Sequence, residues 1–151
     1  MSAAWDAYRA GDVPPMIEAR LADAFVELAG AVDARSSAET LQAAINVAQL
    51  SFDLRLRYDP PAEIELARLD LWAAQLLVDA AADAPGAVTS DVTTLEIVRD
   101  RIAHTVDAAT AEQLDARLGD LRTAADGEDL DAAVDAATQL RDLLATLIPA
   151  G

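Results

Sequence analysis

The chain has 151 residues, a length that suits one domain with its own hydrophobic core. Its net charge is −16 and all 11 basic residues are Arg, a balance that argues against binding to nucleic acid or to an anionic membrane surface. The absence of Cys excludes disulfides, thiolate nucleophiles and Cys-based zinc sites.

Residues 1–13 are expected to form an N-terminal lead-in to a single helical domain over residues 14–151. The lead-in carries Trp5 and Tyr8 but lacks the charged-then-apolar order of a signal peptide. No apolar run approaches the roughly 18 residues of a membrane span, so we expect a soluble chain without membrane insertion. Cytoplasmic is the default compartment, and a protein exported after removal of a signal peptide would have the same sequence.

Apolar residues recur at helical spacing along the rest of the chain. Proline pairs and capping patterns mark the helix starts: Ser36-x-x-Glu39 and Thr110-x-x-Gln113 are typical of capping boxes, and Asp59 precedes two prolines. No segment has the period of two that is typical of a strand, so the predicted fold class is all-α. The predicted helices cover residues 15–34, 37–57, 60–83, 88–107, 111–125 and 128–147.

These helices are expected to pair into three degenerate hairpins. The second arm of each opens with a similar apolar pattern, namely Leu41, Ile45, Ala48; Val88, Val92, Leu95; and Leu130, Val134, Ala137. Because one hairpin cannot bury its own apolar face, the three should pack together, and short connections favour antiparallel neighbours. We predict an antiparallel bundle of about six helices; the alternative is a short solenoid of hairpins.

The strongest candidate for a ligand site lies in the fourth predicted helix. Glu96, Asp100 and His104 are four residues apart and would share one helical stripe, where they form a candidate divalent-metal site. The alternative is a solvated face compensated by Arg99 and Arg101.

Residues 16–106 contain an Asp59-Pro-Pro turn and a helix ending in Arg101-Ile-Ala-His104. With these features the segment resembles the hairpins of small periplasmic four-helix cytochromes, which bind haem b through a Met on the first helix and a His near the end of the last. The resemblance implies haem, with His104 as an axial ligand. Met16 lies about two turns too early to face it, and the hairpin of residues 110–148 is additional.

A polar stripe on the second predicted helix is interpreted as helix surface, or as a buried network if it faces inward. It consists of Gln42, Asn46, Gln49 and Asp53, and Gln75 and Asp79 on the next helix could meet it.

No pattern assembles a catalytic set, because the chain has one His and no Gly-x-Ser-x-Gly motif. We therefore expect no enzyme but a non-catalytic acidic helical-bundle module that binds the basic face of a protein partner. The alternative is divalent-metal or haem binding through His104 with Asp100 and Glu96, in an exported protein. The sequence leaves the oligomeric state open.

Overall fold

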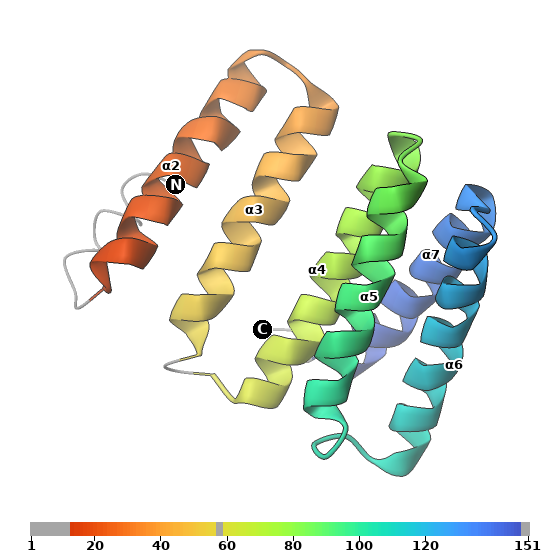
Figure 1. Cartoon of the computed structure of the whole chain (residues 1–151). Coiled ribbons are helices and arrows are strands. Elements are labelled where there is room, and N and C mark those ends of the chain that lie inside the picture. Colours follow the sequence, from red (N-terminus) through yellow and green to blue (C-terminus); the bar gives the residue numbers. More distant parts are fainter. Residues whose placement is uncertain (1–12, 57–58, 149–151) are drawn as a thin grey trace. The chain divides into compact units, whose positions relative to one another are not determined.

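The computed structural model describes residues 13–56 and 59–148, which form six α-helices and no strand (Figure 1). The all-α prediction is confirmed. The expected lead-in lies outside the described residues, apart from Val13. No helix in the described ranges is long and apolar enough to cross a membrane. The helices are α2 (Pro15–Asp33), α3 (Ser37–Arg55), α4 (Pro61–Ala81), α5 (Pro85–Ile102), α6 (Ala108–Asp126) and α7 (Leu130–Leu147).

The chain divides into two compact units, Met1–Asp59 and Pro60–Gly151. The first contains the hairpin of α2 and α3, and the second contains α4 to α7. The expectation of a single domain over residues 14–151 stays a prediction.

The second unit is an antiparallel four-helix bundle, which we call the four-helix unit. α4 contacts both α5 and α7, and α6 contacts the same two helices, so the four close into a ring (Figure 1). Each helix therefore has two neighbours and can bury a wide apolar stripe. Leucines from every helix fill the centre with no exposed surface, among them Leu69, Leu76, Leu95, Leu114, Leu121, Leu140 and Leu144.

The first unit, which we call the N-terminal hairpin, has one helix–helix interface instead of four. Seven apolar side chains are buried in its described residues and three of them are alanine, namely Leu21, Ala24, Ala31, Ala43, Ile45, Phe52 and Leu54. Alanine allows helices to approach closely but removes little apolar area from water. Large apolar side chains consequently stay exposed on this unit, namely Met16, Val26, Val32, Leu41 and Leu56.

The turns within the three consecutive helix pairs share one backbone pattern. In each, the second residue after the helix adopts a left-handed conformation, at Arg35 (φ 55°), Asp83 (φ 56°) and Glu128 (φ 52°). The next amide donates to the carbonyl five residues back, as Ser36 N does to Ala31 O at 3.2 Å, which is the bond of a Schellman motif. The three hairpin connections therefore share one type of turn. The predicted repeat of apolar positions in the second helix of each hairpin stays a prediction.

Several helix starts differ from the predicted ones for local reasons. α5 begins at Pro85 and not at residue 88, because proline fits the first turn of a helix. α6 is capped by Asp107, whose Oδ1 accepts from the amides of Ala109 and Thr110 at 3.0 Å each, so the predicted start after Thr110 is wrong. The capping role of Ser36 is confirmed, since its hydroxyl accepts from Glu39 N.

Candidate functional site

The structure separates the three predicted metal ligands. Glu96 and Asp100 lie on α5, but the helix ends at Ile102 and His104 lies exposed in the turn beyond it. The helical spacing that was to align Asp100 with His104 therefore stops before the histidine. The described part of the chain contains no group of three or more His, Cys, Asp or Glu side chains arranged to hold a metal ion. Metal binding by these three residues stays a prediction without geometric support.

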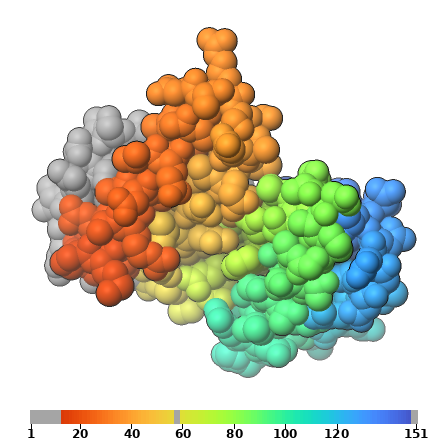
Figure 2. All heavy atoms as spheres, turned by 45° about the horizontal axis from the view of Figure 1, so that its top comes forward, coloured from red at the N-terminus to blue at the C-terminus, as the bar shows by residue number. Residues whose placement is uncertain are grey.

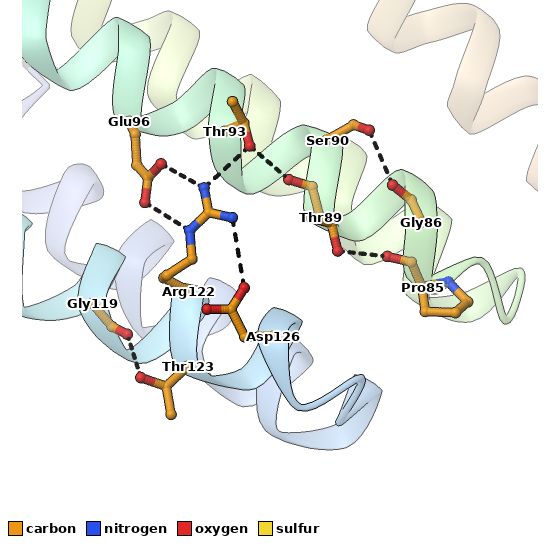
Figure 3. A network of polar contacts seen from close by, with 10 residues as sticks. All are labelled: Pro85, Gly86, Thr89, Ser90, Thr93, Glu96, Gly119, Arg122, Thr123 and Asp126. Carbon is orange, nitrogen blue, oxygen red and sulfur yellow. Dashed lines mark hydrogen bonds and ion pairs between the residues drawn. The ribbon is translucent and has the colours of Figure 1, made fainter.

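Glu96 has a different partner (Figure 3). Its carboxylate accepts from both Nε and Nη2 of Arg122 on α6, with the Nε–Oε1 distance at 3.0 Å, and Arg122 also donates to Thr93 Oγ1 at 3.1 Å. The hydrogen bonds from the guanidinium lower the pKa of Glu96. This bidentate pair connects α5 to α6, so the geometry gives Glu96 a structural role.

The residues implied by the cytochrome resemblance are both exposed. Met16 on α2 has 75% of its surface accessible, and His104 belongs to the exposed turn after α5. A haem requires an apolar pocket around its faces, which an exposed turn histidine does not supply. Haem binding stays a prediction, and the resemblance gains no support from these side chains.

The polar stripe of α3 is partly buried. Gln42, Asn46 and Gln49 are half-buried and Asp53 is exposed, and Gln42 Nε2 donates to Asn46 Oδ1 at 3.3 Å along the helix. The stripe is therefore neither fully solvated nor a closed interior network.

A buried acidic pair lies between α4 and α5 in the four-helix unit. Asp91 of α5 is only 5% exposed, and its side chain hydrogen bonds with Asp79 of α4. Gln75, also buried, donates from Nε2 to Asp79 Oδ2 at 3.0 Å. Among the described residues, Asp91 Oδ2 is the buried side-chain oxygen that has no hydrogen-bond partner. We call Gln75, Asp79 and Asp91 the acidic pair site.

The electrostatics of the acidic pair site follow from burial and proximity. Burial raises the pKa of Asp91 to about 8, and the hydrogen bond to Asp79 and the negative charge of Asp79 act in the same direction. At neutral pH a protonated Asp91 can donate to the Asp79 carboxylate, which leaves Asp91 Oδ2 as the acceptor without a donor. Sequence reasoning considered Gln75 and Asp79 but missed Asp91. The available signal was an acid three residues after Val88 and four before Leu95, on the apolar face of its helix.

No family model, curated protein sequence or solved structure matches the chain.

The ion pairs of the four-helix unit involve every Arg between residues 60 and 148. Three of the pairs are bidentate and connect neighbouring helices: Arg141 with Asp70 (α7 to α4, 2.8 Å), Arg99 with Asp115 (α5 to α6, 2.7 Å) and Arg122 with Glu96 (α6 to α5). The others are Arg68 and Arg101 with Glu65, Arg117 with Asp120, and a second contact of Arg122, with Asp126 at 3.9 Å. Residues 60–151 contain 18 acidic and six basic residues, so this unit carries −12 of the total −16.

Proposed function

We propose that the protein is a non-catalytic binding module whose four-helix unit docks onto a basic protein surface. The observation that carries this proposal is the engagement of all six arginines of residues 60–148 in ion pairs within the unit. The 18 acidic residues of residues 60–151 outnumber these six cations by 12, so the unit keeps a large negative charge. A surface of one sign attracts a partner of the other sign and accelerates its association.

We expect the partner to dock at the end of the bundle that carries the α4–α5 and α6–α7 turns, where five acids are exposed. These two turns lie at the same end because consecutive helices are antiparallel (Figures 1 and 2). We call this surface the acidic end; its exposed acids are Asp83, Asp126, Glu128, Asp129 and Asp131. Two of them have structural contacts that a variant should spare, since Asp129 caps α7 and Asp126 pairs with Arg122 at 3.9 Å.

The experiment compares two variants of equal charge change. The test variant combines Asp83→Asn, Glu128→Gln and Asp131→Asn at the acidic end, and each change keeps the size of the side chain while removing its charge. The control combines Asp100→Asn, Glu112→Gln and Asp142→Asn, which are exposed acids toward the opposite end of the same unit. Proteins captured from a cell lysate by the wild-type chain are identified, and the affinity of a purified partner is measured by calorimetry for all three chains.

The expected partner has a basic surface, binds at least about tenfold more weakly to the test variant, and binds the control almost normally. Raising the salt concentration from 50 mM to 500 mM should weaken wild-type binding by a similar factor, because salt screens exposed charges. If neither the salt concentration nor either variant changes the affinity, the proposal that the acidic end binds through its charge is wrong.

A further inference from the structure

We propose that Asp79 and Asp91 form a binding site for one hard divalent cation, Mg²⁺, Mn²⁺ or Ca²⁺, between α4 and α5. The site is separate from the predicted Glu96, Asp100 and His104 set, and it does not depend on the partner proposed above. Two observations point to it: carboxyl groups from facing helices lie within hydrogen-bonding distance of each other, and a buried oxygen of one of them has no partner.

The charge of the pair is the first reason to expect a cation. Two carboxylates this close repel each other, so they require either a shared proton or a bound cation. A proton leaves one negative charge on the pair and leaves Asp91 Oδ2 without a donor. A divalent cation neutralises both carboxylates and supplies a partner for that oxygen. An unpartnered buried acceptor is costly, so a ligand that satisfies it is favoured.

Access to the pair and its preorganisation are the second reason. Asp79 is half-buried, which gives the pair a side open to water, while Asp91 at 5% exposure closes the inner side. The bond from Gln75 Nε2 to Asp79 Oδ2 (3.0 Å) fixes the orientation of the outer carboxylate. Outer hydrogen bonds of this kind position metal-binding carboxylates.

The donor atoms of the pair determine the class of ion. The pair offers carboxylate oxygens and neither imidazole nor sulfur, because the chain has no Cys and its single His lies in the exposed turn after α5. Oxygen donors select hard cations over zinc, copper or nickel. Two carboxylates with water completing the shell is a common way to hold Mg²⁺ or Mn²⁺.

The test is a Mn²⁺ titration at pH 8, in which electron paramagnetic resonance measures the free ion. Four chains are compared: wild type, Asp79→Asn, Asp91→Asn, and Glu112→Gln as a control that removes one exposed acid from the same unit. We expect one saturable Mn²⁺ per wild-type chain, binding at least about tenfold weaker in both pair variants, and wild-type affinity in the control. Mn²⁺ should also raise the thermal midpoint of wild type and control but not of the pair variants.

Two outcomes would overturn the proposal. Equal Mn²⁺ binding by all four chains would assign the ion to the acidic surface in general. Absence of saturable binding by wild type, with a folded far-UV spectrum, would mean that the pair holds a proton only.

Discussion

The N-terminal hairpin and the four-helix unit differ in how completely they remove apolar side chains from water. Of the 12 largest fully buried side chains among the described residues, 11 belong to the four-helix unit and only Leu21 belongs to the hairpin. The exposed large apolar side chains show the opposite distribution, since five of six are on the hairpin and only Ile97 is on the four-helix unit. The unit with the larger buried core also has the larger net charge, since residues 60–151 carry −12 and residues 1–59 carry −4.

The difference shows what ring closure contributes. A helix with one neighbour buries one narrow stripe, whereas a helix with two neighbours buries most of an apolar face. A large buried area offsets the chain entropy lost on folding and also tolerates a highly charged exterior. The four-helix unit can therefore tolerate the repulsion within a strongly acidic surface and the cost of a buried acidic pair. The hairpin buries less apolar area and has less hydrophobic stabilisation to offset such costs.

The largest expected effect is the loss of a central leucine. Leu76→Ala removes a side chain with no exposed surface from the core of the four-helix unit, and should lower its free energy of unfolding by about 2–5 kcal/mol. Leu41→Ala on the hairpin truncates a side chain that is 52% exposed and should cost less than about 1 kcal/mol. Urea unfolding followed by circular dichroism measures both. Equal losses would contradict the proposed difference in packing.

The second prediction concerns pH. The pKa of Asp91 is raised from 3.8 to about 8, so the folded chain holds a proton that the unfolded chain releases between these values. Stability from this group is fully present below about pH 4 and is lost as pH rises through about 8. Asp91→Asn mimics the protonated acid and should stabilise the chain by about 2 kcal/mol at pH 9, with almost no gain at pH 4.

Thermal unfolding from pH 4 to 9 in EDTA-containing buffer measures this profile, with Asp100→Asn as the control for removal of one exposed acid. The difference between Asp91→Asn and wild type should grow with pH. A constant difference across the range would rule out titration of Asp91 as its cause.

Sequence reasoning performed well where periodicity and local chemistry decide the outcome. Six helices could be predicted because apolar spacing is local, and the cap at Ser36 because it involves residues three apart. The acidic pair site was missed, because the contact of Asp79 with Asp91 depends on how α4 and α5 face each other across their turn and not on spacing along one helix. The Glu96–Arg122 pair has the same origin, as its residues are 26 positions apart. The metal interpretation depended on the end of one helix, which lies at Ile102, before His104.

The third prediction applies one backbone change to both units. Arg35→Gly and Glu128→Gly place glycine at left-handed positions, where a side chain is strained, and each should stabilise its own unit by about 1 kcal/mol. Glu112→Gly is the control of opposite sign, since an exposed helical position of α6 should lose about 1 kcal/mol. Hydrogen exchange of individual amides assigns each effect. If the units unfold separately, Arg35→Gly will slow exchange in α2 and α3 alone.

The smallest expected effects come from ion pairs. A double-mutant cycle with Glu96→Gln and Arg122→Met should give a coupling energy of about 0.5–1 kcal/mol, because the pair is bidentate and joins two helices but remains partly exposed. The matching pair of the hairpin unit, Arg55 with Asp59 at 2.7 Å, is more exposed and joins neighbouring turns, so its coupling should be about 0.3 kcal/mol. Both values should fall in 1 M salt. A larger coupling for Arg55 with Asp59 would mean that exposure and local spacing do not decide the strength of these contacts, and that the two units differ less in electrostatics than in packing.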